Sequence, residues 1–223
     1  IDIIGNFDRS LLISSLDSLA SALACSALTC ILLNQRLSVY NMSRFQLYQQ
    51  LKNFKLVAFD LDGTIWSPDM YQLWGGGSPF RPAGNSKDLL DCANNTVRML
   101  GISSAVLHEL KNDEHLVDTK VAWVSCTDEP DWAAECLDLF ETQPGRQPLS
   151  TIVDSVQIYK ANKQEHFRRL KKEYPEIEYS QMLFFDNEMH NIRNVAKLGV
   201  HCIYCPDGIT ERAWEEGLSK FVS

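Results

Sequence analysis

Two kinds of feature are scarce in this chain, and each scarcity excludes a class of protein. Lysine and arginine number 21 against 29 aspartates and glutamates among 223 residues, so the formal net charge is −8. A protein that coats nucleic acid needs clustered cations, so no nucleic-acid partner is expected. A long uninterrupted apolar stretch is also missing, because Asp17 divides the Leu-, Ala- and Ser-rich region at residues 11–33. No stable membrane association is therefore expected.

A disulfide framework is not expected either. The seven cysteines are odd in number, scattered, and mostly placed in apolar segments. Such a set favours reduced thiols and a cytoplasmic location. Cys202 and Cys205 form one C-x-x-C, but Ile203 and Tyr204 between them are typical of a strand. This favours a role in core packing over a redox or zinc pair.

The first 41 residues differ from the rest of the chain. Asp2 and Asp8 stand where a secretory signal carries positive charge, and they also weaken a match to a mitochondrial presequence. Met42 precedes the first periodic segment. We expect residues 1–41 to be an extension outside the catalytic fold, either disordered or absent from the mature protein. Residues 42–223 are then the folded domain, and organellar targeting by residues 1–41 stays open.

The most informative segment is a short apolar run that ends in two carboxylates. Leu56–Phe59 has the pattern of a strand covered on both faces in a parallel sheet. In extended backbone Asp60 and Asp62 project the same way, while Gly63 permits a turn and Thr64 offers a hydroxyl to hold it. Two close carboxylates repel unless a cation joins them. A hard cation such as Mg²⁺ is the natural partner.

Strand-like and helix-like stretches alternate from residue 56 onward, which is typical of an α/β domain with a mostly parallel sheet. We predict a three-layer, Rossmann-like fold. The expected core strands lie at residues 56–59, 120–125, 151–158, 182–186 and 201–205.

The interval between the first two core strands is too long for a plain crossover, so an insert is expected over about residues 66–100. Residues 66–81 are typical of an irregular flap, and residues 89–100 of a small hairpin. A helix capped by Ser103 or Ser104 should follow.

Polar side chains recur where the later strands end. Ser125 follows one strand, Asp186 and Asn187 follow another, and Lys163 begins a helix. Together with the two acids after the first strand, this set suits phosphoryl transfer. Mg²⁺ and Lys163 would neutralise the phosphate, so that one carboxylate attacks phosphorus. The second acid would protonate the leaving oxygen and then activate water.

These motifs resemble the haloacid dehalogenase superfamily, whose signature is D-x-D-x-T, then Ser or Thr, then Lys, then an acidic pair. More closely, they resemble the magnesium-dependent phosphatase family over roughly residues 54–221. The segments that carry this closer resemblance are FDLDGTIW, S-x-T, K-x-x-H-F and SQMLFFDNE.

The resemblance implies a magnesium-dependent phosphomonoesterase that forms an aspartyl-phosphate and acts on phosphotyrosine proteins or sugar phosphates. It implies that Asp60 is the nucleophile and Asp62 the acid and base. The other implied roles are phosphate binding by Leu61, Ser125, Cys126 and Lys163, Mg²⁺ binding by Asp60, Asp62 and Asn187, and support by Thr64 and Asp186.

Three positions depart from the family pattern. Gly63 replaces a Tyr, Cys126 stands where Arg is expected, and Asn187 replaces an Asp. An amide oxygen can still ligate Mg²⁺, so weaker metal affinity is expected; Asn187 would also serve as a plain helix cap. The competing hypothesis is a catalytically weak or inactive binding protein on the same fold.

Overall fold

The computed structural model describes residues 46–84, 86–143 and 146–222. The predictions for residues 1–41, and for the first residues of the predicted domain, lie outside the described residues. The compact unit that begins at Leu47 is described by itself. Across the described ranges, each helix is too short or too polar to cross a membrane.

The core of this unit is a five-stranded parallel sheet in the order β7-β6-β1-β8-β9. Four strands match the prediction closely, and the fifth, β7, begins at Ser155 rather than at Thr151, which ends a 3-10 turn instead. The strands are β1 (Leu56–Phe59), β6 (Lys120–Ser125), β7 (Ser155–Ile158), β8 (Met182–Asp186) and β9 (His201–Tyr204).

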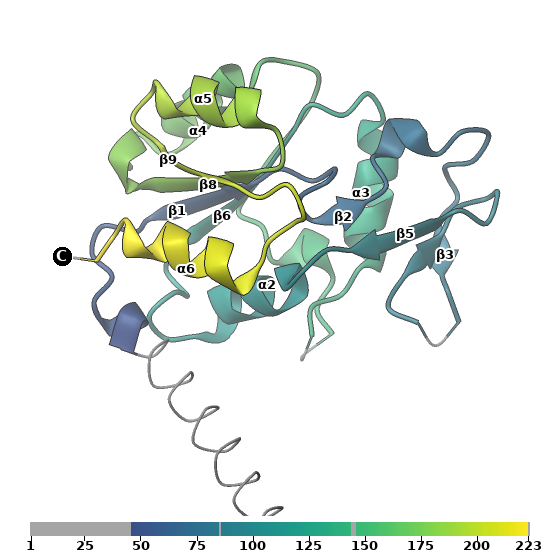
Figure 1. Ribbon diagram of the computed structural model, residues 1–223, viewed down its shortest axis with the longest axis horizontal. Helices are drawn as coiled ribbons and strands as arrows, with labels where there is room; N and C mark the ends of the chain where they lie inside the picture. Colours follow the sequence, from purple (N-terminus) through teal and green to yellow (C-terminus); the bar gives the residue numbers. More distant parts are fainter. Residues whose placement is uncertain (1–45, 85, 144–145, 223) are drawn as a thin grey trace, which may run out of the picture. The chain divides into compact units, whose positions relative to one another are not determined.

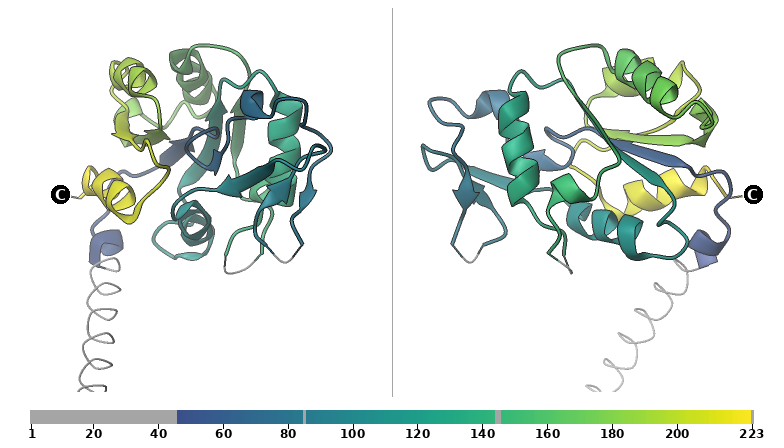
Figure 2. Two further views of the ribbon diagram at one scale, coloured as in Figure 1. Left: turned by 45° about the vertical axis from the view of Figure 1, so that its right-hand side comes forward. Right: turned by 180° about the vertical axis from the view of Figure 1, so that it is seen from behind.

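Helices cover both faces of this sheet (Figures 1 and 2). On β1, Leu56 and Ala58 pack into the cluster that includes α4 (Lys163–Glu173) and α5 (Met189–Ala196). Val57 and Phe59 point the other way, because successive strand residues alternate between faces. Their cluster includes α2 (Ser103–Asn112), α3 (Pro130–Leu139) and α6 (Glu211–Ser219). The predicted three-layer α/β fold is confirmed.

The strand order has a reversal beside β1. The chain runs outward from β1 to β6 and β7, and then returns to place β8 on the other side of β1. Loops after β1 and β8 therefore leave the sheet in diverging directions, and the crevice between them is where open parallel sheets bind ligands. The acids predicted at these two strand ends meet at this point.

A second sheet is inserted between β1 and α2, and Figure 1 shows it beside the main sheet. Its order is β2-β5-β4-β3, and the predicted hairpin is the antiparallel pair of β4 and β5. The flap is more regular than expected, since it contributes two short strands and a 3-10 turn. The elements are β2 (Trp66–Ser67), η1 (Met70–Gln72), β3 (Arg81–Pro82), β4 (Leu89–Leu90) and β5 (Thr96–Met99).

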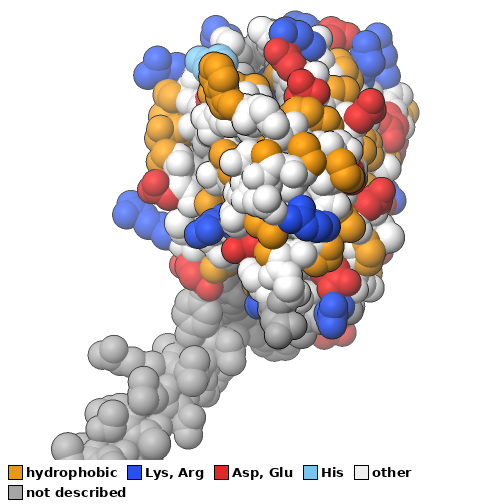
Figure 3. All heavy atoms as spheres, turned by 90° about the vertical axis from the view of Figure 1, so that its right-hand side faces the viewer, with side chains coloured by type: hydrophobic (Ala, Val, Ile, Leu, Met, Phe, Trp, Pro, Cys, Tyr) orange, Lys and Arg blue, Asp and Glu red, His pale blue; other side chains and the backbone are white. Residues whose placement is uncertain are grey.

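The face of this insert that Figure 3 presents carries apolar side chains with acidic and basic groups scattered between them. Inside the insert, one buried carboxylate organises the loops. Asp91 accepts hydrogen bonds from the backbone N–H groups of Gly77 (2.9 Å), Ala93 (2.9 Å) and Asn95 (2.7 Å) and from the Asn95 amide (2.9 Å). The insert thus adds these polar bonds to its own apolar burial, which includes Trp66, Met70 and Val97.

Two cap assignments from the sequence are wrong. Ile102 occupies the N-cap of α2, and the Ser103 hydroxyl instead donates to the Leu100 carbonyl at 2.7 Å. Glu188, not Asn187, is the N-cap of α5. Asn187 therefore lies in the loop before the helix, where its side chain can face the crevice between the loops after β1 and β8.

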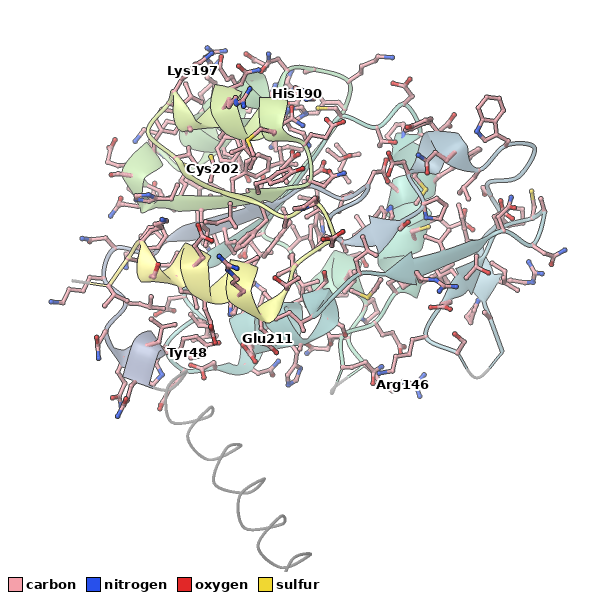
Figure 4. All side chains as sticks on the ribbon, viewed as in Figure 1. Tyr48, Arg146, His190, Lys197, Cys202 and Glu211 are labelled. Atoms are coloured by element: carbon pink, nitrogen blue, oxygen red, sulfur yellow. The ribbon has the colours of Figure 1, made fainter. Side chains whose placement is uncertain are left out.

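The C-x-x-C segment does not form a thiol pair. Cys202 packs against the cluster on the α4 and α5 face, whereas Cys205 belongs to the cluster on the other face. Figure 4 labels Cys202 on β9 beneath α5. Burial raises the pKa of each thiol to about 12, so both stay protonated. The predicted role in core packing agrees with this arrangement.

Candidate active site

A cavity of about 410 Å³ opens at the carboxyl edge of the main sheet, at the strand-order reversal. Residues that are far apart in the sequence converge on it from the ends of β1, β6 and β8 and from the start of α4. Six of the predicted site residues line it: Asp60, Asp62, Ser125, Cys126, Lys163 and Asn187. Three others, Leu61, Thr64 and Asp186, are buried behind them.

The buried ammonium of Lys163 is the central cation of this cavity. Its Nζ contacts Asp60 Oδ1, donates to the Val124 carbonyl at 2.5 Å, and lies 3.6 Å from Asp186 Oδ2. Burial acts to lower the pKa of Lys163, but the carboxylates of Asp60 and Asp186 outweigh it, so its pKa is raised and the charge is kept. Asn162 caps the helix that presents Lys163.

Thr64 joins the loops that follow β1 and β8. Its hydroxyl accepts the Asn187 backbone N–H at 3.0 Å. The same hydroxyl lies 3.4 Å from both Asp60 Oδ2 and Asn187 Oδ1, and its single proton can go to either oxygen. Thr64 is fully buried, so it fixes the spacing between the predicted nucleophile and the predicted amide ligand.

Asp62 lines the cavity beside Asp60. Its Oδ1 accepts a hydrogen bond from the indole N–H of Trp66 at 2.7 Å. Burial first, and the charge of Asp60 second, raise the pKa of Asp62 to about 7. The sequence did not identify Trp66 as a partner of Asp62; it placed Trp66 only at the start of the predicted flap.

Asp186 is fully buried beneath the cavity. It accepts hydrogen bonds from the Glu188 N–H at 2.7 Å and from the Asn191 amide at 3.1 Å. Burial, and then the neighbouring Asp60, raise the pKa of Asp186 to about 7, while Lys163 acts against this rise. Asn191 was missed as a polar partner, although it follows the acidic pair on the same loop and helix.

Ser125 is the last residue of β6, Cys126 follows it, and both line the cavity. The Ser125 hydroxyl accepts the Thr127 N–H at 3.3 Å, and the Cys126 thiol donates to the Ala161 carbonyl at 2.9 Å. Burial raises the pKa of Cys126, so the thiol adds no charge to the wall. The Leu61 side chain packs in the core, and only its main chain is left for a phosphate contact.

The family model for acid phosphatases matches residues 52–223. The chain is also 32% identical over 169 residues to magnesium-dependent phosphatase 1 of Homo sapiens, and the match covers 75% of this chain and 86% of that protein. This chain belongs to the acid phosphatase family. The family relationship expected from the motifs is confirmed.

More distant likenesses exist among solved structures. One is the N-terminal part of protein BF1531 from Bacteroides fragilis, described as containing a phosphatase domain complexed with Mg (17% identity, TM-score 0.46, covering 78% of this chain and 41% of that one). Another is CbbY from Rhodobacter sphaeroides in complex with phosphate (14% identity, TM-score 0.48, covering 71% and 88%).

The oxygen donors of this acid phosphatase family member fit a hard divalent cation. Three carboxylates crowd one end of the sheet, and Lys163 is the buried cation that faces them. Burial is the main cause of the raised pKa values of Asp62 and Asp186, and the nearby Asp60 carboxylate adds to both. A cation bound nearby would relieve that repulsion. Among the described residues no three His, Cys, Asp or Glu side chains are arranged for a metal. The amide oxygen of Asn187 is a further oxygen atom at the same cavity.

The rim of the cavity holds residues that the sequence did not single out as site residues. Asp69 and Tyr71 reach it from the insert, and Glu188, His190 and Asn194 reach it from the β8–α5 segment. Figure 4 labels His190 on α5, next to the cavity side of the main sheet. The sequence could not identify these residues, because residues in loops and on helix faces follow no pattern that shows which of them border a cavity.

Proposed function

We propose that this protein is a magnesium-dependent phosphomonoesterase that works through an aspartyl-phosphate on Asp60. One observation carries the proposal: Asp60, Ser125, Lys163 and Asn187 come from four separate segments and border one cavity. Membership of the acid phosphatase family and the name of the human relative support the reaction class and the metal.

In the first step, a carboxylate oxygen of Asp60 attacks phosphorus and the bond from phosphorus to the ester oxygen breaks. Asp62 gives its proton to that oxygen, so the product leaves as a neutral alcohol or phenol. Lys163 and the Ser125 hydroxyl hold phosphate oxygens. Because Lys163 already contacts Asp60, the same ammonium orients the nucleophile and reduces its repulsion with the phosphate.

In the second step, the Asp62 carboxylate removes a proton from water, and the water oxygen attacks phosphorus. The bond from phosphorus to Asp60 breaks, inorganic phosphate is released, and Asp62 is protonated again. Each turnover thus returns both acids to their starting states.

The Asp60 carboxylate, the Asp62 carbonyl and the Asn187 amide oxygen would hold Mg²⁺. When bound, Mg²⁺ supplies a Lewis acid that polarises the phosphoryl oxygens and offsets the carboxylate charge. Lys163 and Thr64 keep these oxygens in place from behind.

Phosphotyrosine proteins are the substrates we favour, with sugar phosphates as the competing class. The insert that reaches the cavity consists of short strands and one 3-10 turn, which leaves room for a bulky leaving group. Tyr71, at 64% exposure, offers an aromatic face at the rim.

The alternative is a weakly active or inactive binding protein, and Asn187 and Cys126 are the observations that favour it. Turnover of p-nitrophenyl phosphate with Mg²⁺ and with EDTA separates the two. We expect metal-dependent release of phosphate and, after acid quench, an enzyme mass increased by one phosphoryl group. No turnover at any Mg²⁺ concentration would favour the binding protein. Phosphotyrosine peptides and sugar phosphates, assayed in parallel, rank the substrate classes.

A further inference from the structure

We infer that Trp66 is a positioning residue for Asp62, a role that rests on the proposed function and deepens it. The indole Nε1 donates to Asp62 Oδ1 at 2.7 Å. Trp66 is fully buried, so no water competes for this bond. The bond crosses from the inserted sheet to the loop after β1.

The indole is held rigidly at its other side. Trp66 begins β2, where it pairs with Met99 of β5, and its ring stacks on Phe140 with ring centroids 6.0 Å apart. A ring clamped between a strand pair and a second aromatic side chain has one available orientation. The N–H therefore points at Asp62 whether or not a substrate is bound.

The backbone around Trp66 closes the turn that carries Asp62. The Gly63 N–H donates to the Trp66 carbonyl at 2.8 Å, and the Trp66 N–H donates to the Leu61 carbonyl at 3.2 Å. Asp62 and Trp66 also form an isolated parallel bridge. The side chain and the main chain of Trp66 together fix both the position and the rotation of the Asp62 carboxyl group.

The consequence for the reaction follows from the chemistry of the donor. An indole N–H only donates, so Asp62 Oδ1 must accept and cannot itself carry a proton toward the ring. The proton that goes to the leaving oxygen, and later comes from water, is thereby assigned to Oδ2. The Met70 backbone N–H also bonds to Asp62. Without the indole, this backbone donor alone leaves the carboxyl group less firmly fixed, and proton transfer loses its alignment.

Trp123 supplies a matched control. It is also a fully buried tryptophan of the same apolar cluster, but its indole nitrogen has no hydrogen-bond partner among the described residues. Trp123→Phe removes an unused N–H, whereas Trp66→Phe removes the one that Asp62 accepts. The two variants lose similar ring area and differ in this bond.

The test compares phenyl phosphate, whose leaving oxygen needs a proton, with p-nitrophenyl phosphate, whose leaving oxygen does not. In W66F we expect kcat/KM to fall about 10- to 100-fold for phenyl phosphate and less than about threefold for p-nitrophenyl phosphate. We also expect a burst of p-nitrophenol, because slowed water activation lets the aspartyl-phosphate accumulate. W123F should leave the ratio of kcat/KM for the two substrates unchanged and should give no burst of p-nitrophenol.

Equal losses for both substrates in W66F, or the same selective loss in W123F, would overturn the inference while leaving the proposed function intact. The wild-type turnover of p-nitrophenyl phosphate tests the proposed function separately.

A second measurement covers the case in which W66F does not fold. In the Asp62→Ala variant, the indole N–H resonance of Trp66 should shift upfield while that of Trp123 stays in place. An unmoved Trp66 resonance would show that the bond is absent in solution.

Discussion

The main sheet and the inserted sheet differ in strand length and in where their buried polar groups lie. On the main sheet, whole strands such as Leu56–Phe59 are buried on both faces, and the polar side chains of the cavity gather at the carboxyl edge. In the insert, strands are short and the loops depend on one buried carboxylate, Asp91, with an aromatic contact between Phe80 and Trp132. The loops of the insert therefore depend on individual polar bonds in addition to apolar burial.

This difference assigns the two regions different tasks. The sheet edge holds Asp60, the proposed nucleophile, together with Lys163 and the proposed amide ligand Asn187, while the insert shapes the rim through Asp69 and Tyr71. Trp66 connects the two, since it belongs to the insert and holds Asp62 of the sheet edge. Substitutions at the sheet edge should therefore alter turnover or Mg²⁺ binding. Substitutions in the insert should mainly lower the free energy of unfolding.

The largest effect is expected at Asp60. Asp60→Asn removes the attacking carboxylate while the amide can still contact Thr64 and Lys163, so the fold should be kept. We expect turnover of p-nitrophenyl phosphate to fall by at least about 10³-fold. Phosphate release and the circular dichroism spectrum are measured together. A folded Asp60→Asn protein with substantial activity would mean that another group attacks phosphorus.

The next largest effect is expected at Gly63, which lies in the loop after β1 and faces Asn187 in the loop after β8. Its φ is +73°, and a Cβ there would lie 2.1 Å from the Asn187 amide nitrogen. Gly63→Ala should cost about 1–2 kcal/mol of backbone strain and in addition push Asn187 aside, which weakens Mg²⁺ binding. Isothermal titration with Mg²⁺ measures the second effect.

Gly75 in the insert is the control for this strain. Its φ is +71°, but nothing lies within 4 Å of the Cβ position. Gly75→Ala should therefore lower the free energy of unfolding with no change in Mg²⁺ affinity. If both variants bind Mg²⁺ as the wild type does, the contact between Gly63 and Asn187 has no role at the metal site.

In the insert, Asp91→Ala should lower the free energy of unfolding by about 1–3 kcal/mol, because it leaves buried N–H groups without their acceptor. Asp88→Ala is the control, since Asp88 only approaches exposed Arg98 at 3.9 Å and should cost less than about 1 kcal/mol. Urea unfolding gives both values. Equal losses would show that the Asp91 bonds do not hold the insert.

The same carboxylate predicts a dependence on pH. Burial acts to raise the pKa of Asp91, but the hydrogen bonds from Asn95, Gly77 and Ala93 outweigh it and lower the pKa below its ordinary value. A lowered pKa in the folded state means that the stabilisation is present above about pH 4 and is lost as the pH falls through the folded-state value. The stability gap between wild type and Asp91→Ala should therefore narrow below about pH 4 and stay constant above it.

The smallest effect is expected at Asn187. Asn187→Asp adds a carboxylate to the proposed Mg²⁺ ligands, so the half-saturating Mg²⁺ concentration should fall by up to about tenfold, or about 1.4 kcal/mol. The activity at saturating Mg²⁺ should change less. An unchanged half-saturating concentration would place residue 187 outside the ligand set.

The sequence predicted the strands of the main sheet well, because a continuous apolar run bounded by polar residues is a local signal. β1, β6 and β8 match their predicted bounds, whereas β7 begins at Ser155 rather than at Thr151, which belongs to a 3-10 turn. The insert was located, but its strands β2 and β3 were missed because two-residue strands have no periodicity. At the site, the lining residues were predicted and their partners were not. Trp66, Asn191 and the Val124 carbonyl become partners only through packing.

By itself, the sequence determined where each reactive side chain leaves its strand or begins its helix, because strand ends and helix starts depend on neighbouring residues. It thereby determined the family and the residues that line the cavity. Only the tertiary structure decided that Thr64 spaces Asp60 from Asn187, that Lys163 lies between Asp60 and Asp186, and that an indole of the insert holds Asp62. These relations depend on burial and on bonds between distant segments, and no local pattern encodes either.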